Sequence, residues 1–296
     1  MKRNAFEGRL LGAHMSIAGG VDSAIGRGER VGCTAIQIFT KNNNQWNAKP
    51  LSGEEIGAFK EAQQKTKVVA SLAHCAYLIN LASPDKGNWE RSFNGMKNEV
   101  LRAGELEIPY LVLHPGSHTG SGATEGIKRI SDAINRIHEE QAHRLPMILL
   151  ECMAGQGSSI GSKFEELRDI MADIKDQSRI GICIDTCHMF AAGYDIRTRE
   201  TYDASFQEFD RIVGLEWIKA FHLNDSKKDL ACHVDRHEHI GKGFIGLEAF
   251  RCLLNDPRFS KLPMVLETPK NEDDSWDLMN LDALESLFTR SEKVRS

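Results

Sequence analysis

Short apolar segments rich in β-branched residues alternate along the chain with segments whose apolar residues recur at intervals of three and four. The first pattern predicts buried strands, and the second predicts amphipathic helices. Eight strands are predicted, over residues 10–16, 35–40, 68–74, 110–115, 147–152, 180–185, 218–224 and 264–268. Eight helices are predicted, over residues 21–31, 53–65, 89–106, 124–143, 162–176, 202–212, 246–254 and 277–288.

This regular alternation predicts an α/β fold of the (β/α)8 TIM-barrel type. Eight β/α units fit the length of 296 residues, and uninterrupted apolar strands suit a parallel sheet that is covered on both faces. No linker, low-complexity segment or block of charge divides the chain. We therefore expect residues 1–296 to form a single domain.

Composition limits the partners that the chain can have. The net charge of −5 provides no overall basic field, so any binding to nucleic acid depends on a local patch or on bound cations. No segment is apolar enough to span a membrane, and the charged N-terminus does not resemble a secretory signal. Seven cysteines without a C-x-x-C pair suit a reduced compartment. We expect a cytoplasmic protein, associated with the nucleoid if the source is bacterial, with no membrane partner.

The candidate chemistry lies at the ends of the predicted strands. Each of the last six strands ends in histidine, aspartate or glutamate, and the loop after the seventh strand adds two more such residues. These positions are His74, His114, Glu151, Asp185 with the nearby His188, His222, Glu267, and in the loop Asp235 and His237. The C-terminal ends of parallel barrel strands open onto one face, where barrel enzymes place their chemistry. One such residue alone is more often an ordinary loop residue, but nine on one face predict a site.

Five imidazoles and four carboxylates are more than one zinc ion uses, since catalytic zinc usually takes three protein ligands. With one bridging carboxylate, nine ligands suit two or three ions. The high share of imidazole favours zinc, with manganese or iron as alternatives in some sites. Clustered divalent ions favour the hydrolysis of phosphate esters, because they activate water and stabilise the leaving oxygen.

Several longer motifs carry a resemblance to a known family. They are Gly-Ala-His-Met-Ser at 12–16, Tyr-Leu-Ile-Asn-Leu at 77–81, His-Pro-Gly-Ser-His at 114–118, residues 185–195, residues 222–227, residues 235–241 and Leu-Glu-Thr at 266–268. Through these motifs the chain resembles, nearly from end to end, the endonuclease IV family of apurinic/apyrimidinic endonucleases.

The resemblance implies three zinc ions per chain. The first set of ligands would be His74, His114 and Glu151; Glu151 would bridge to a second set of Asp185, His222 and Glu267; the third set would be His188, Asp235 and His237. The implied reaction is hydrolysis 5′ to an abasic site, leaving a 3′-hydroxyl and a 5′-deoxyribose phosphate, together with processing of blocked 3′ ends. The implied catalytic carboxylates are Glu267, as the base that helps to activate water, and the bridging Glu151.

The resemblance also implies contacts with double-stranded DNA that carries abasic sites or blocked 3′ ends. The abasic sugar must leave the helix, and apolar or aromatic wedges commonly fill the gap. Tyr77 and Leu78 occupy the wedge positions of the family, although the residues alone would suggest packing of the loop. His118 and Lys227 are candidate phosphate contacts. Because the duplex needs the whole rim, we expect a monomer.

Two positions depart from the family pattern. In the loop 41–46, which resembles a DNA-inserting loop, Asn44 stands where an arginine is often found, so binding loses one cation. Trp46 in the same loop suits a lid aromatic and a packing residue equally. Cys152 and Met153 follow Glu151 where the family more usually has Asn-Thr, which changes the surroundings of the ligand but not the ligand.

Two other functions compete with this interpretation. A metal-dependent sugar isomerase or epimerase would share the rim of carboxylates and histidines. Such an enzyme would use fewer ions and would not need wedge residues such as Tyr77 and Leu78. A non-catalytic protein that binds DNA damage would bind the lesion without cutting it. The number of bound metal ions distinguishes the isomerase or epimerase from the endonuclease. An incision assay distinguishes the non-catalytic damage-binding protein from it.

Overall fold

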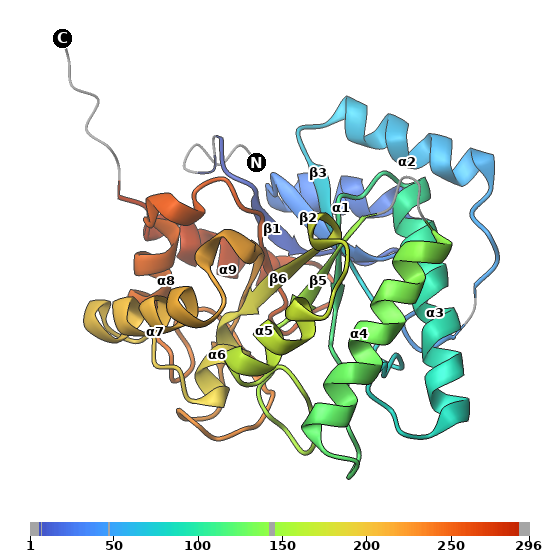
Figure 1. Ribbon diagram of the computed structural model, residues 1–296. Coiled ribbons are helices and arrows are strands. Elements are labelled where there is room, and N and C mark those ends of the chain that lie inside the picture. Colours follow the sequence, from blue (N-terminus) through green and yellow to red (C-terminus); the bar gives the residue numbers. More distant parts are fainter. Residues whose placement is uncertain (1–5, 7, 47, 142–145, 290–296) are drawn as a thin grey trace.

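Eight parallel strands close into a barrel in the computed structural model of the chain, which describes residues 6, 8–46, 48–141 and 146–289 (Figure 1). The barrel strands are β1 (Leu11–His14), β2 (Ala35–Phe39), β3 (Val69–His74), β4 (Tyr110–Leu113), β5 (Met147–Glu151), β6 (Ile180–Asp185), β7 (Ile218–Leu223) and β10 (Met264–Leu266). They follow one another in chain order, and β10 closes the barrel by pairing with both β7 and β1. The predicted (β/α)8 barrel is therefore confirmed.

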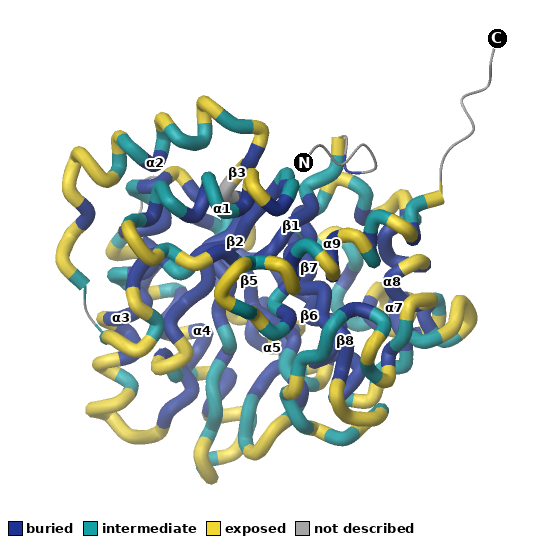
Figure 2. The backbone as a smooth tube through the Cα atoms, turned by 180° about the vertical axis from the view of Figure 1, so that it is seen from behind, coloured by how far each residue is buried: buried dark blue, intermediate teal, exposed yellow. Residues whose placement is uncertain are grey.

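The predicted helices form the outer layer. They are α1 (Ser23–Val31), α2 (Gly53–Lys65), α3 (Lys86–Glu105), α4 (Ala123–Glu140), α5 (Phe164–Ala172), α7 (Arg199–Ile212), α8 (Leu247–Leu254) and α9 (Ser275–Ser286). Figure 2 shows buried strands at the centre and exposed helix faces outside. In α4 the buried residues Ile127, Ile130, Ile134 and Ile137 recur every three or four positions, so one face of the helix packs inward.

Three short elements near the C-terminal mouth of the barrel were not predicted. The short helix α6 (Thr186–Ala192) follows β6 directly, because the Asp185 side chain accepts a hydrogen bond of 3.0 Å from the His188 amide and caps the helix. His188 therefore lies on a helix rather than at a strand end. The strands β8 (Asp225–Ser226) and β9 (His237–Glu238) form a small antiparallel pair after β7.

Parts of two sequence predictions lie outside the described residues: most of the charged N-terminal segment, and the last residues of the helix predicted over 124–143. Within the described ranges, no helix combines the length and the apolar character that a membrane span requires.

The interior of the barrel is filled by one small, fully buried residue cluster. Six strands each contribute one residue to this apolar plug: Leu72, Val112, Leu149, Cys183, Ala220 and Val265. Packed side chains of this kind make the centre of a TIM barrel a core rather than a pore. The plug therefore fills the space below, so any inward-pointing residue further along the strands must lie on top of it.

Glycine is required at one close approach between strands. A Cβ atom added to Gly12 on β1 would lie 1.8 Å from the carbonyl oxygen of Ala35 on β2. Any side chain at this position would push the two strands apart. The packing of β1 against β2 thus requires the glycine of the Gly-Ala-His motif.

A buried histidine in α4 generates a prediction about stability. His138 is 6% exposed, and neither ring nitrogen has a hydrogen-bond partner among the described residues. Burial, helped by the nearby Arg179 guanidinium, lowers its pKa from 6.5 to about 4. Between pH 6.5 and pH 4, His138 is therefore protonated in the unfolded chain but not in the folded chain. The free energy of unfolding consequently falls as the pH falls through this range.

We expect His138→Leu to remove part of this loss. When the pH falls from 7.5 to 5, the free energy of unfolding of the variant should fall by on the order of 1 kcal/mol less than that of the parent, after allowance for solvent screening. Urea unfolding at the two pH values measures this difference. An identical pH dependence in parent and variant would contradict the assignment to His138.

Candidate metal centre

The alternation of side chains along the strands places a layer of ionisable groups directly above the apolar plug. On or directly after each of six strands, the residue two positions beyond the plug residue is a histidine, aspartate or glutamate. These residues are His74, His114, Glu151, Asp185, His222 and Glu267. Residues two apart in a strand point to the same face, so all six converge at the C-terminal mouth. Glu151, Asp185 and His222 have no solvent exposure.

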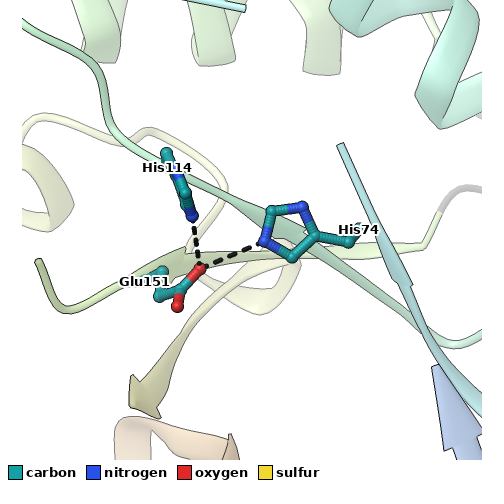
Figure 3. Close-up of side chains that lie close together, drawn as sticks. All are labelled: His74, His114 and Glu151. Atoms are coloured by element: carbon teal, nitrogen blue, oxygen red, sulfur yellow. Dashed lines mark hydrogen bonds and ion pairs between the residues drawn. The ribbon is translucent and has the colours of Figure 1, made fainter. Parts of the chain in front are cut away.

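The first group joins two imidazoles to one carboxylate oxygen. His74 Nε2 lies 3.2 Å and His114 Nε2 lies 3.0 Å from Glu151 Oε2 (Figure 3). One candidate ligand atom from each residue lies within 4.8 Å of the others. This is the first of the sets expected from the sequence.

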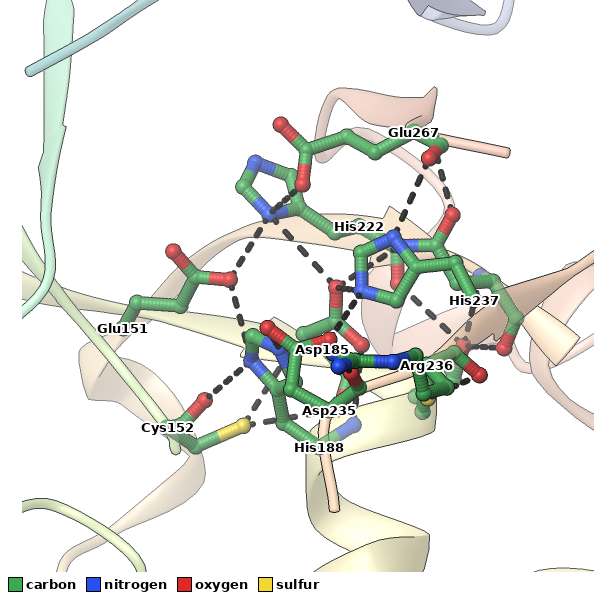
Figure 4. Close-up of polar contacts among 12 residues, drawn as sticks. Glu151, Cys152, Asp185, His188, His222, Asp235, Arg236, His237 and Glu267 are labelled. Carbon is green, nitrogen blue, oxygen red and sulfur yellow. Dashed lines mark hydrogen bonds and ion pairs between the residues drawn. The ribbon is translucent and has the colours of Figure 1, made fainter. Parts of the chain in front are cut away.

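The second group uses the other oxygen of the same glutamate. His222 Nδ1 lies 3.1 Å from Glu151 Oε1, 3.1 Å from Glu267 Oε2 and 3.8 Å from Asp185 Oδ2 (Figure 4). Candidate ligand atoms of these four residues also lie within 4.8 Å of one another. Glu151 thus presents one oxygen to each group, as a bridging carboxylate does.

The third group comes from elements outside the barrel. Asp235 places Oδ2 3.2 Å from His188 Nε2, on α6, and Oδ1 3.2 Å from His237 Nε2, on β9. The groups whose ligand atoms all lie within 4.8 Å of one another are two other combinations of described residues: Asp185 with His188 and His237, and Cys187 with Asp235 and His237. The expected set of His188, Asp235 and His237 is joined only pairwise, through the two oxygens of Asp235. Burial raises the pKa of the Cys187 thiol to about 12, which disfavours the thiolate form that binds metal.

The imidazoles are oriented as metal ligands are. His74 Nδ1 donates to the Cys75 carbonyl at 2.7 Å, His188 Nδ1 to the Cys152 carbonyl at 3.0 Å, and His237 Nδ1 to the Glu267 carbonyl at 3.0 Å. Each such bond leaves the Nε2 lone pair facing the site. The Nε2 atoms of His188 and His237 are buried and make an ion-pair contact with Asp235, but no aligned hydrogen bond with any of the described residues. The side chains present therefore fit divalent cations that prefer imidazole and carboxylate.

The electrostatics of the centre favour positive charge. Burial alone would raise the pKa of Glu151 and Glu267, but the imidazoles around them, His222 foremost, hold both values well below the usual range. Burial alone would lower the pKa of His222 and His188, yet the surrounding acidic groups raise both well above the usual range. The same balance raises the pKa of His237 to about 9. A cluster that attracts protons in this way also attracts metal cations.

Sequence reasoning missed Gln37, a fully buried residue on β2. Gln37 Nε2 donates to Glu267 Oε1 at 2.5 Å, and Gln37 Oε1 accepts a hydrogen bond of 2.8 Å from His222 Nε2. The second bond keeps the proton of His222 on Nε2, so Nδ1 faces the carboxylates. The available signal was a lone polar residue inside the apolar run Ala-Ile-Gln-Ile-Phe.

Asn224 also had no role from the sequence, although its motif was noted. Its Nδ2 donates to Asp185 Oδ2 at 2.7 Å, and its Oδ1 accepts from the Glu267 amide at 3.0 Å. The Thr186 hydroxyl donates to the Asn224 carbonyl at 2.7 Å. Asn224 therefore fixes two of the carboxylate positions relative to each other.

Cys152 points away from the site. Its sulfur accepts a hydrogen bond from the Asp185 amide at 3.1 Å, so the side chain contacts the backbone of β6. Burial raises the pKa of its thiol.

Tyr77 and Leu78 lie at the edge of the metal centre, on the segment after β3. They are 56% and 37% exposed. The Tyr77 ring centroid lies 5.5 Å from that of His114, 5.4 Å from that of His74 and 5.4 Å from that of Phe39. Large apolar surface is thus presented to solvent beside the imidazoles.

The other expected contact residues have different surroundings. Asn44 and Lys227 are exposed. Trp46 is half-buried and packs against the core, and a Cβ atom added to Gly95 on α3 would lie 3.5 Å from its ring. His118 Nδ1 accepts the amides of Gly120 and Gly122, both at 3.2 Å, which leaves the proton of a neutral ring on Nε2.

Comparisons with known proteins agree with the barrel fold. A family profile described as xylose isomerase-like TIM barrel matches residues 26–287. The probable endonuclease 4 of Chloroflexus aggregans is 55% identical over 277 residues, which cover 94% of this chain and 97% of that protein.

Solved structures resemble the chain as well. Endonuclease IV from Thermus thermophilus superposes with a TM-score of 0.83 at 33% identity, covering 94% of this chain and 98% of its own. A D-tagatose 3-epimerase-like protein superposes with a TM-score of 0.73 at 20% identity, covering 94% and 96% of the two chains. The last likeness reflects the shared fold alone.

The contacts of Gln37 generate a prediction about metal affinity. We expect Gln37→Leu to weaken the binding of divalent metal by about 10- to 100-fold, because His222 loses its orienting acceptor and Glu267 loses a donor. Competition with a metal-binding dye measures the affinity independently of any activity. Gln177→Leu is the matched control, since it removes two hydrogen bonds to Met171 and Ile174 at the other end of the barrel. Equal affinities in the two variants would contradict the role of Gln37.

Proposed function

The chain belongs to the endonuclease IV family of xylose isomerase-like TIM barrel proteins, and on that basis we propose that it is a DNA repair endonuclease that acts at abasic sites. The proposed reaction is hydrolysis of the phosphodiester 5′ to the lesion, leaving a 3′-hydroxyl and a 5′-deoxyribose phosphate. Processing of blocked 3′ ends is the related activity. One observation carries the proposal: three groups of imidazoles and carboxylates meet around Glu151 at the open end of the barrel.

We propose that this cluster holds three zinc ions. The first two proposed ligand sets, His74, His114 and Glu151, and Glu151, Asp185, His222 and Glu267, are each close groups. The third proposed set, His188, Asp235 and His237, is supported by the contacts of Asp235 with both imidazoles. The mixture of five imidazoles with four carboxylates supports zinc over magnesium. When bound, such cations acidify water near neutral pH and offset the negative charge of a phosphodiester.

The carboxylates of the chain have distinct tasks. Glu151 lies between two ligand groups and keeps them at a fixed separation through its two oxygens. Glu267 lies at the same rim, 12% exposed, with its pKa held well below the usual range. It is therefore ionised and accepts a hydrogen bond from the attacking water, which aligns the water for in-line displacement.

The rim residues supply the contact with damaged DNA. A sugar without its base leaves the stack at a smaller cost than an intact nucleotide, which pairs and stacks. We propose that Tyr77 and Leu78, exposed beside the imidazoles, fill the gap in the helix. Partial shielding of the Tyr77 hydroxyl from water, together with the charges of Glu267 and Glu151, raises the pKa of the phenol, so the wedge stays uncharged.

The remaining contacts are to the phosphate backbone. The Nε2 proton of His118 and the ammonium of Lys227 are suitable donors, and Asn44 offers an amide to a base edge or a phosphate. Trp46 supports the loop from beneath through its packing on α3, and it remains a candidate contact through its exposed part.

We further propose that residues 1–296 act as a single-domain monomer in the cytoplasm. The need to accept duplex DNA at the rim supports a monomer, because a partner chain would cover this surface. No disulfide joins the cysteines of the described residues, which suits a reducing compartment.

An incision assay tests the main proposal. Zinc-loaded protein should cut a duplex with one stable abasic analogue only 5′ to the lesion, and polymerase should extend the new 3′ end. Glu267→Gln should lower kcat by about 10²- to 10⁴-fold, because the acceptor for the water proton is lost. Glu248→Gln, an exposed change on α8, is the matched control and should leave kcat unaltered.

The failures are separable. Lesion binding without incision would select a damage-binding protein, and turnover of a sugar by protein that ignores abasic DNA would select an isomerase or epimerase. Either result contradicts the endonuclease proposal.

The departure at Asn44 gives a second test. We expect Asn44→Arg to tighten binding to abasic duplex and to steepen the dependence of log Kd on log salt by about one unit, since one more phosphate is neutralised. Fluorescence anisotropy between low and moderate salt measures both effects. Gln177→Arg adds the same charge at the far end of the barrel, and an equal effect there would show that position 44 has no special contact with DNA.

A further inference from the structure

A buried ion pair lies beneath the two loops that carry the proposed DNA contacts. Lys41 Nζ lies 2.7 Å from Glu99 Oε1, and the two side chains are 2% and 1% exposed. Lys41 begins the loop that contains Asn44, while Glu99 lies on α3. The proposed chemistry uses neither residue, and both lie away from the imidazole cluster.

The carboxylate of Glu99 joins the two loops to each other. Its Oε2 accepts the hydroxyl of Thr40, directly after β2, at 2.9 Å. Its Oε1 accepts the amide of Ala76, directly before Tyr77, at 3.2 Å. One side chain therefore binds the segment after β2 and the segment after β3 at the same time.

The loop after β2 is held at further points by the same contacts. Lys41 Nζ donates to the Gln45 carbonyl at 2.8 Å and closes the loop around Asn44. On α3, one turn after Glu99, Arg102 donates to the Thr40 carbonyl at 3.2 Å and to the Lys49 carbonyl at 2.6 Å. The beginning and the end of the loop are thus both bound to one helix.

Stability alone is a weak reason for this arrangement. Burying two charges has a desolvation cost that often exceeds their mutual attraction, and apolar residues of similar volume commonly serve stability as well. What an apolar pair lacks is direction: it does not accept an amide from one loop and a hydroxyl from the other. The hydrogen bonds of Glu99 set the separation of Tyr77 and Asn44, which apolar packing would leave loose.

We propose that Glu99 is a positioning residue that fixes the two DNA-contacting loops in one relative arrangement, so that both engage the damaged duplex together. This inference rests on the function proposed above. Glu99 touches neither the substrate nor the metal ligands; it acts through Ala76, Thr40 and Lys41.

The test uses the full-length, metal-loaded protein and the double variant Glu99→Leu/Lys41→Met, which removes the ion pair and the acceptors for both loops without leaving one charge buried alone. Hydrogen exchange should become faster in both segments, residues 40–46 and 76–79. For an abasic duplex, Kd and KM should rise by about 10- to 100-fold, because the two loops must then be ordered on binding, while kcat changes by less than about threefold.

A double-mutant cycle gives a readout that general destabilisation would not move. If Glu99 acts through the loops, the double variant should weaken binding much less in a Tyr77→Ala/Asn44→Ala background than in the parent. The control is Asp256→Asn, which removes a buried carboxylate at the other end of the barrel that accepts from the Tyr202 hydroxyl at 2.9 Å. It should lower the melting temperature and leave KM unchanged.

Unchanged exchange in either loop, an unchanged KM, or fully additive effects in the cycle would overturn the role of Glu99 while leaving the endonuclease intact. Parent protein that neither binds nor incises abasic duplex would overturn the proposed function, and this inference with it.

Discussion

The two-residue repeat of side-chain direction, imposed on strands that close into a barrel, is the constraint on which the site depends. Inside the barrel it stacks one polar residue above one apolar residue on six strands, with Leu149 below Glu151 and Ala220 below His222 as examples. The apolar plug fills the space beneath, so the polar groups cannot withdraw into the barrel. They meet at its mouth, where a parallel barrel collects the ends of all its strands.

Such a concentration of buried ionisable groups is costly unless every group has a partner. The imidazoles and carboxylates pair with one another, and this pairing lowers the pKa values of Glu151 and Glu267 while raising that of His222. Around them, Gln37 and Asn224 supply hydrogen bonds that fix ring tautomers and carboxylate positions. The result is a preorganised set of ligands, in which the barrel strands position the first two groups.

The rim adds a different kind of order. Its segments leave the barrel just beyond the polar layer, and buried carboxylates, one on an outer helix and one on β8, bind them in place. Glu99 on α3 contacts the segments after β2 and β3 together, and Asp225 accepts the amides of Gly241 and Ile245 in the loop that precedes α8. Exposed apolar residues such as Tyr77 are therefore presented on a supported surface.

The sequence by itself determined the local part of this structure. Strand and helix periodicity predicted all eight barrel strands, and the histidines and carboxylates at strand ends predicted the residues that the structure brings together. Helix α6 was missed because its cap, Asp185, also reads as the last residue of an apolar strand, and β8 and β9 are too short to show a period.

Only the tertiary structure decided which distant residues meet. Gln37 and Glu267 lie 230 positions apart, and Lys41 and Glu99 pair across two elements. Periodicity reports the direction of a side chain relative to its own strand or helix, whereas a contact between strands depends on how the barrel closes and on its register. Closure sums the pairing of all eight strands, and no short stretch of sequence contains that information.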